Sequence, residues 1–172
     1  MAHGPELCAI GFEPSLWEVG LEQIATPEQM DGYIDRALKD SKTQAFAVRH
    51  LATNRLAGSS RYMNMELGHK RVEIGSTWYG QEYQRTGVNT ECKYLLLGHA
   101  FEQLGVNRVE LKTDVLNERS QKAMLRLGAK QEGTLRRHMI TAGGRVRDTV
   151  YFSILREEWP AVKARLEGML AR

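Results

Sequence analysis

Residues 71–105 read RVEIGSTWYGQEYQRTGVNTECKYLLLGHAFEQLG, and this stretch decides the fold that we expect. Its first nine residues are rich in Val, Ile, Thr, Trp and Tyr, which favour a β-strand over 71–79. Gly80 and Gly87 mark the two ends of a polar loop that follows this strand. Beyond it, helical spacing and the left-handed cap expected at Gly105 predict a helix over 88–104. Its apolar rows are Val88, Cys92, Leu96, Ala100 and Leu104, with Leu95, Leu97 and Phe101 beside them.

The loop between this strand and this helix is a candidate anion-binding site. The first amides of a helix lack partners, and the helix dipole adds partial positive charge there. Because Gly87 lets the backbone approach a ligand, residues 85–90 predict an amide cradle for a pyrophosphate. The chain lacks GxxxxGK[ST] and GxGxxG, which excludes the usual nucleoside-triphosphate and dinucleotide motifs. The alternative is that Gly87 only permits a turn.

The loop also carries a family resemblance. Gln84-Arg85-Thr86-Gly87-Val88-Asn89 resembles the (Q/R)xxGx(G/A) segment of GCN5-related N-acetyltransferases (GNATs), which binds the pyrophosphate of acetyl-CoA. Asn89 departs from that pattern, because the family usually has Gly or Ala there. Further landmarks in family order, spread over about residues 45–155, resemble the RimJ/RimL-type branch. They are Glu73-Ile74-Gly75, Asn117-Glu118-Arg119-Ser120, Leu127-Gly128-Ala129 and Glu132-Gly133.

The resemblance implies an α/β (α+β) fold with a mixed, mostly antiparallel central sheet flanked by helices. It also implies a first strand that would end near Met1. We therefore expect that strand to be missing, with the sheet edge either open or covered by another element. No internal repeat, low-complexity tract or linker interrupts the chain, so we expect a single N-acetyltransferase domain over residues 1–172.

Local patterns predict the elements around this unit. Residues 1–21 predict a short helix and an irregular loop, with Phe12 and Trp17 as apolar contacts. Thr26-Pro27-Glu28-Gln29 forms a capping box that begins a helix to about Asp40. The remaining expected elements are strands at 44–50 and 56–64, a strand at 108–113 parallel to 71–79, a helix at 118–127 between Asn117 and Gly128, a hairpin of 130–140 and 146–155, and a C-terminal helix after Pro160.

Composition narrows the class of protein. The chain has 172 residues, 42% of them hydrophobic, and a net charge of +3, which is ordinary for a globular protein and too weak to argue for nucleic acid. It shows no apolar run of membrane-spanning length and no signal peptide, so we expect a cytoplasmic protein. Cys8 and Cys92 are expected as free thiols, and the five histidines lack metal-ligand spacing, so no metal site is expected.

Acetyl transfer needs a group that removes a proton from the amine, donors for the oxyanion and a proton for the departing thiolate. Glu73 is the candidate base, because it matches the Glu of the family's E-I-G segment. Strand alternation places it on one face with Arg71, Gly75 and Thr77. The alternative is a surface glutamate paired with Arg71 or with a lysine on a neighbouring strand.

Ser120 is the candidate acid toward the thiolate, since the resemblance puts the Ser of N-x-x-S near the sulfur and Asn117 at the pantetheine arm. The alternative is an ordinary N-cap at Asn117 with a common first-turn serine. Tyr94 and Tyr151 are further candidates for the acid. Trp78 and Tyr79 would hold the pantetheine by main-chain groups, or their rings only pack. The expected cofactor-binding residues are Trp78, Tyr79, Gln84, Arg85, Thr86, Gly87, Val88, Asn89, Thr90 and Asn117.

We therefore expect an acetyl-CoA-dependent N-acetyltransferase in which a primary amine attacks the thioester directly in a ternary complex. The acceptor is either a protein N-terminal amine or a small-molecule amine. The basic run 135–138, with Arg145 and Arg147 across the hairpin, is either a solvated face or a guide for an acidic or peptide acceptor. The alternative from another class is a non-catalytic CoA-binding or ribosome-associated module. An uncovered edge strand would favour a homodimer.

Overall fold

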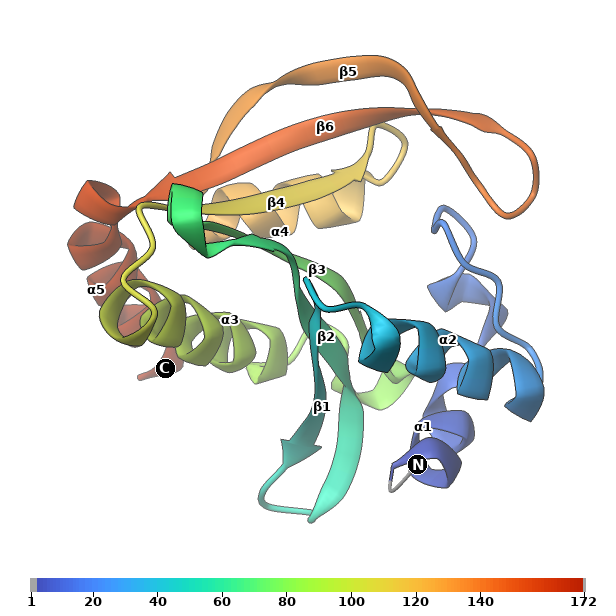
Figure 1. Cartoon of the computed structure of the whole chain (residues 1–172). Coiled ribbons are helices and arrows are strands. Elements are labelled where there is room, and N and C mark those ends of the chain that lie inside the picture. The colour runs from blue at the N-terminus through green and yellow to red at the C-terminus, as the bar shows by residue number, and fades with distance from the viewer. Residues whose placement is uncertain (1–2, 172) are drawn as a thin grey trace.

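The computed structural model describes residues 3–171, so the ends of the expected domain, residues 1–2 and 172, lie outside the described part. Six strands form one sheet in the order β1-β2-β3-β4-β6-β5 (Figure 1). Only β3 and β4 pair in parallel, and all other neighbours are antiparallel, which confirms the mixed, mostly antiparallel sheet. The strands are β1 (Gln44–His50), β2 (Arg55–Glu66), β3 (Arg71–Tyr79), β4 (Arg108–Asp114), β5 (Lys130–Ile140) and β6 (Val146–Leu155).

Helices cover both faces of the sheet. Figure 1 shows α1 and α2 on one side and α3, α4 and α5 on the other. The α3–α5 side holds the larger apolar cluster, which includes Leu97, Phe101 and Phe152. The α1–α2 side holds a smaller cluster around Trp17 and Met30. The helices are α1 (Gly4–Gly11), α2 (Pro27–Lys39), α3 (Val88–Gly98), α4 (Glu118–Leu127) and α5 (Trp159–Leu170).

No strand lies within residues 3–43, and β1 forms one edge of the sheet. The segment that precedes β1 folds instead into α1, a short 3₁₀ turn and α2, with α1 packed on β2 and α2 on β1. The absence of an earlier strand from the described residues agrees with the expectation. β5 forms the opposite edge and is exposed along its whole length.

The predicted helix caps explain where two helices begin and end. In the capping box of α2, Thr26 Oγ1 accepts a hydrogen bond from the Gln29 amide at 3.3 Å, and Gln29 Oε1 accepts one from the Thr26 amide at 3.2 Å. Asn117 Oδ1 accepts a hydrogen bond from the Ser120 amide at 3.0 Å at the start of α4. Gly128, at φ 106°, ends that helix in the left-handed region, which glycine tolerates without cost.

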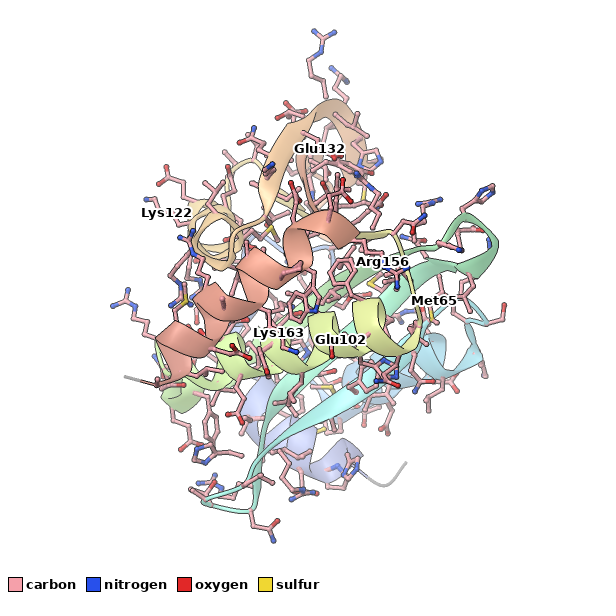
Figure 2. All side chains as sticks on the ribbon, turned by 90° about the vertical axis from the view of Figure 1, so that its left-hand side faces the viewer. Met65, Glu102, Lys122, Glu132, Arg156 and Lys163 are labelled. Carbon is pink, nitrogen blue, oxygen red and sulfur yellow. The ribbon has the colours of Figure 1, made fainter. Side chains whose placement is uncertain are left out.

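The long helix continues beyond α3 as a π-helical segment, His99–Gln103, before the left-handed Gly105. Of the predicted apolar rows, Val88 and Leu104 are half-buried and Leu95 is exposed at 62%, whereas the others are buried, because α3 and the π-helical segment turn one stripe toward the sheet and Leu95 lies outside it. Figure 2 shows Glu102 of the π segment beside Lys163 of α5. Glu102 Oε1 lies 2.8 Å from Lys163 Nζ and accepts a second hydrogen bond from Trp159, so α5 is fixed across this helix.

A bulge in β3 changes which residues face each side of the sheet. Ser76 is left-handed at φ 45°, and the pairing with β2 moves from Arg61–Gly75 to Ser59–Trp78, so β3 contains one extra residue. Trp78 therefore joins the α1–α2 cluster. Thr77 turns to the α3 side, and the expectation that it shares a face with Glu73 is wrong, because simple alternation ends at the bulge.

Candidate active site

The two parallel strands separate after a short paired stretch. Their register covers only Arg71–Glu73 against Arg108–Glu110, yet β3 continues to Tyr79 and β4 to Asp114. The edge of β3 that faces β4 is therefore unpaired by strand over its second half. Two side chains bind carbonyls there: Tyr33 Oη donates to Ser76 O at 3.3 Å, and Gln84 Nε2 donates to Tyr79 O at 3.1 Å. The gap opens at the carboxyl ends of two parallel strands, a common place for ligands.

The start of α3 lies beside this gap, and among residues 3–171 only the Val88 amide of its first turn has a side-chain acceptor. Gly87 is the N-cap residue, is exposed, and has no heavy atom within 4 Å of the position that a Cβ would take. Arg85 is left-handed at φ 61°. Thr86 Oγ1 donates to Tyr83 O at 2.7 Å and accepts from the Val88 amide at 3.3 Å, which fixes the turn. Open space and an uncapped helix start together favour an anion here.

The remaining residues of the expected cradle lie in the first turn of α3. Thr90 is buried, while Asn89 is half-buried and its side chain makes no hydrogen bond within residues 3–171. Two arginines of α4 reach this loop, and the motif analysis did not predict their contacts. Arg119 Nη1 donates to Gln84 Oε1 at 2.8 Å, and Arg126 Nη2 donates to Thr90 Oγ1 at 3.3 Å. They add positive charge beside the uncapped amides.

The start of α4 borders a cavity of about 360 Å³ shared with the N-terminal loop, between Val19 and Leu116–Asn117. Asn117 caps α4 through its oxygen, as the structural alternative predicted, but its Nδ2 has no hydrogen bond within the described residues. Ser120 is half-buried, and no described residue hydrogen-bonds its hydroxyl. Both groups therefore retain polar atoms available to a ligand.

Glu73 lies on the α1–α2 side of β3, and its exposed fraction is 7%. Its Oε2 accepts hydrogen bonds from Asn64 Nδ2 at 2.7 Å and from Lys112 Nζ at 2.8 Å, whereas its Oε1 has no hydrogen bond among residues 3–171. Burial would lower the pKa of Lys112, but the bond and charge of Glu73 raise it above its usual value. The pairing with a neighbouring-strand lysine that sequence reasoning offered is present, and one carboxylate oxygen stays unengaged.

The aromatic residues that were candidates for the acid or for pantetheine binding lie in different parts of the structure. Tyr94 Oη donates to Glu167 Oε1 of α5 at 2.9 Å, so Tyr94 is directed toward α5. Tyr151 lies on the Glu73 side, with Lys112 Nζ 4.6 Å from its ring centroid and the His138 ring 5.8 Å away. The rings of Trp78 and Tyr79 are buried in the two apolar clusters, as the packing alternative predicted.

Two buried cations escaped the sequence analysis. Arg61 stacks on the Tyr33 ring at 3.8 Å, and its Nη2 donates to Tyr33 O at 3.1 Å. Lys93 Nζ donates to Thr77 Oγ1 at 2.8 Å on the α3 side, and burial lowers the pKa of Lys93 to about 8. Helical spacing could have indicated Lys93, since Leu96 and Leu97 follow it by three and four residues. No comparable signal marks Arg61.

Over residues 3–171, no group of three or more His, Cys, Asp or Glu side chains is placed to hold a metal ion. Cys8 and Cys92 are free thiols. No helix in the same part of the chain is both long and apolar enough to cross a membrane.

A mostly antiparallel sheet with one separated parallel pair, covered by helices on both faces, defines a mixed α/β protein. Comparison with known proteins gives the family. Residues 2–130 match the family described as acetyltransferase (GNAT) domain. The chain therefore belongs to the GNAT family and is an acetyl-CoA-dependent acetyltransferase.

Individual relatives agree. A protein of Bacillus subtilis (strain 168) named "Putative ribosomal N-acetyltransferase YdaF" is 30% identical over 142 residues, which are 80% of this chain and 76% of the relative. The crystal structure of a GCN5-related N-acetyltransferase from Brucella melitensis is 32% identical, with a TM-score of 0.90 over 97% of this chain and 77% of that one. Spermidine N-acetyltransferase from Vibrio cholerae, solved with CoA and spermine, is 17% identical and shows the fold alone, with a TM-score of 0.76 over 92% and 93% of the two chains.

Proposed function

We propose that acetyl-CoA lies in the gap between β3 and β4 and that a primary amine attacks its thioester directly. The observation that carries this proposal is the register of the two strands, which pair over three residues and then part. The pyrophosphate would accept hydrogen bonds from the amides of residues 85–90, with Gln84 beside them. The pantetheine would run along the main chain of Trp78 and Tyr79, toward the unengaged Nδ2 of Asn117.

The amine must lose a proton before its lone pair attacks. Glu73 Oε1 would accept that proton, directly or through one water, while Asn64 and Lys112 hold the other carboxylate oxygen. The N–C bond to the acetyl group then forms, and the C–S bond breaks. Ser120 would donate a proton to the departing thiolate, and amides of the unpaired β3 edge would stabilise the oxyanion.

The acceptor amine would bind on the side of the sheet where Glu73 lies, because Glu73 is the proposed base. We propose a primary amine of a protein N-terminus, as in the RimJ/RimL-type branch. The name of the Bacillus subtilis relative supports this choice, and a small-molecule amine is the second candidate. Initial rates on a panel of N-terminal peptides against a panel of amino acids, polyamines and aminoglycosides separate the two. Turnover confined to the small amines would contradict the N-terminal acceptor.

Thermal unfolding tests the cofactor site independently of the acceptor. A ligand at about a hundred times its dissociation constant adds about 2.7 kcal/mol of stability, which is several degrees for a domain of this size. Acetyl-CoA and CoA should both raise the melting temperature, and ATP should not. An unchanged melting temperature with acetyl-CoA would mean that the gap and the Gly87 turn do not hold it.

The single domain and the homodimer also remain proposals. Two free sheet edges, β1 and β5, support association of two copies, because an open edge offers unpaired main-chain groups. Sedimentation equilibrium of the full chain gives the mass directly. A monomer at every concentration would remove the homodimer.

A further inference from the structure

The side chain of a buried arginine in the β5–β6 hairpin has no hydrogen bond within residues 3–171. The side chain of Arg147 in β6 has an exposed fraction of 7%, and none of its donors has an acceptor within residues 3–171. Arg147 Nε is fully enclosed. It forms an ion pair with Asp114, whose Oδ2 lies 3.8 Å from this nitrogen. A guanidinium carries five donors, and of the three guanidinium nitrogens of Arg147 only Nε is both enclosed and without a hydrogen-bond partner.

The charges around Arg147 do not balance. Asp114 is 1% exposed and is shared with a second guanidinium, because Arg145 Nη2 also bonds its Oδ2. The Glu73 carboxylate, whose charge also acts on Arg147, is paired with Lys112. The two guanidinium groups therefore share the one carboxylate of Asp114, which leaves an excess of one positive charge. Thr149, two residues along β6 and 1% exposed, adds a buried hydroxyl without a partner. Buried donors normally have partners, so two orphans beside an excess charge indicate a missing anion.

This group lies on the acceptor side of the sheet. Val150, Phe152 and Ile154 alternate into the α3–α5 cluster, which turns Arg147 and Thr149 to the side of Glu73. The charge of Glu73 acts on Arg147, so the two groups share one environment. The strand segment that carries Asp114 belongs to the part of β4 that has left β3. The uncapped start of α3, where the cofactor phosphates are proposed to bind, projects from the opposite side.

The turn between β5 and β6 covers part of the side of the sheet on which Arg147 lies. Figure 1 shows the turn between β5 and β6 reaching over the segment between α1 and α2. Gln23 Nε2 of that segment lies 3.9 Å from where a Cβ of Gly143 would stand. Thr141, at the base of the turn, is buried and accepts a hydrogen bond from the Arg145 amide at 3.2 Å. A ligand group at Arg147 is therefore screened from water, which strengthens an ion pair.

We infer that Arg147 and Thr149 form an acceptor subsite for a carboxylate, so that the preferred substrate is an amine that carries a carboxylate close to it. This inference rests on the proposed function. Guanidinium and carboxylate form two parallel hydrogen bonds, and a single negative charge balances the excess. The carboxylate is either an acidic side chain next to a peptide N-terminus or the α-carboxylate of a free amino acid.

The basic run of the hairpin does not share this property. Arg136 and Arg137 are exposed, and neither side chain forms a hydrogen bond or an ion pair with residues 3–171. They agree with the solvated-face interpretation. Arg147 is the member of the group that fits the acidic-acceptor interpretation. Arg136→Gln, on the same hairpin, is therefore a matched control for Arg147→Gln.

Ligand binding gives the first test and needs no turnover. Thermal unfolding of the full chain with CoA present is measured with glutarate and with neutral glutaramide. Glutarate should raise the melting temperature of the wild type and of Arg136→Gln but not of Arg147→Gln, and glutaramide should raise none. No difference between glutarate and glutaramide on the wild type would overturn the inference. Equal stabilisation of wild type and Arg147→Gln by glutarate would also overturn it.

Turnover gives the second test and separates the two carboxylate sources. Peptide pairs with Asp or Asn, and Glu or Gln, at the second position are compared with alanine against alaninamide. A buried charge-assisted contact predicts a preference of about tenfold to hundredfold in kcat/KM for the charged member of one pair type. Arg147→Gln should bring the ratio of kcat/KM between the charged and the neutral member close to one. Thr149→Val should weaken the preference less, and it replaces Arg147→Gln if that variant does not fold.

The two proposals fail differently. A shift with acetyl-CoA but no acetylation of any amine would count against the proposed function. Acetylation of charged and neutral acceptors at equal kcat/KM would leave acetyl transfer in place and overturn the carboxylate subsite.

Discussion

The two faces of the sheet are made by alternate residues of the same strands, yet they are filled in opposite ways. Toward α3–α5, Leu111, Phe152 and Ile154 are at most 1% exposed and touch apolar neighbours. Toward the other side, Glu110, Asp114 and Arg147 are at most 8% exposed and carry charge. Burial of a charged group costs free energy, whereas burial of an apolar side chain such as leucine stabilises the fold. The charged face is therefore the one on which we place the proposed acceptor site.

The charged face itself is uneven. At its far end Glu110 is held by Arg108, with Nε 3.0 Å from Oε1, and by Lys112 at 3.4 Å. Burial raises the pKa of Glu110, but these cations outweigh it and keep the pKa below its usual value. Near the gap, Arg147 and Thr149 have no hydrogen-bond partner. Glu110, where β3 and β4 pair, is therefore held by two cations, whereas Arg147 and Thr149, beside the part of β4 that has left β3, each keep an enclosed polar atom without a hydrogen bond.

Phe152→Ala should give the largest effect, because Phe152 is fully buried on the apolar face. Loss of a core phenylalanine costs about 3–5 kcal/mol of unfolding free energy. Denaturant unfolding measures it. Exposed Leu95→Ala is the control, with a change within about 0.5 kcal/mol. A loss of unfolding free energy for Phe152→Ala as small as that for Leu95→Ala would contradict the view that the apolar face supplies most of the stability.

Glu73→Gln should lower kcat by about a hundredfold, equivalent to about 2.7 kcal/mol in the barrier, if Glu73 is the base. Ser120→Ala should lower it by a similar factor as the acid. Lys112→Met removes the partner of Glu73 without removing the carboxylate, so it separates the ion pair from the chemistry. Rates within about threefold of wild type for Glu73→Gln would leave Glu73 as a structural ion-pair partner.

Lys93→Met tests the charged exception on the apolar side. Burial lowers the pKa of Lys93 from 10.5 to about 8. Between these values the unfolded chain binds more protons than the folded one, so wild-type stability rises with pH over that window. The variant should lose this rise and be more stable at pH 7 by about 1–2 kcal/mol, after loss of the bond to Thr77. Unfolding at pH 7 and pH 10 measures both effects, and an equal pH slope in the two proteins would refute the assignment.

Gly87→Ala should give the smallest effect and concerns the ligand alone. A Cβ there meets no protein atom within 4 Å, and φ is −67°, so the melting temperature without ligand should not change. Affinity for acetyl-CoA should fall by about tenfold, because the methyl group would keep the pyrophosphate from the amides. Calorimetric titration measures it, with Gly133→Ala as the control. Unchanged affinity would move the pyrophosphate away from this turn.

Sequence patterns predicted the bounds of most elements, because caps and alternation are local. Asn117, Gly128 and the Thr26 capping box act within one helical turn, and the structure places the ends of α4 and the start of α2 there. The facing of Thr77 could not be predicted, since a left-handed serine at position 76 leaves no sign in the alternation. The burial of Arg147 depends on a hairpin folding over the sheet, a long-range event that a basic run does not encode.

In the candidate site, too, local sequence predicted some features, and others depend on contacts between distant elements. The stretch 84–90 predicted a helix start after β3, and the pyrophosphate cradle there stays a prediction. The contacts of Arg119 and Arg126 depend on where α4 lies relative to Gln84 and Thr90, which are distant in the chain. The pairing of Glu73 with Lys112 required the parallel register of β3 and β4. Each missed feature joins elements distant in the chain.

The bulge at Ser76 sets a rule for recombining this protein with its relatives. Because the extra residue decides that Thr77 faces α3 and Trp78 faces Trp17, β3 has a fixed length as well as a fixed composition. Deleting one residue at this point would exchange the two side chains between layers and put an indole against Lys93. Chimeras whose crossover preserves the residue count of 71–79 should therefore fold, and those that shorten it by one should not.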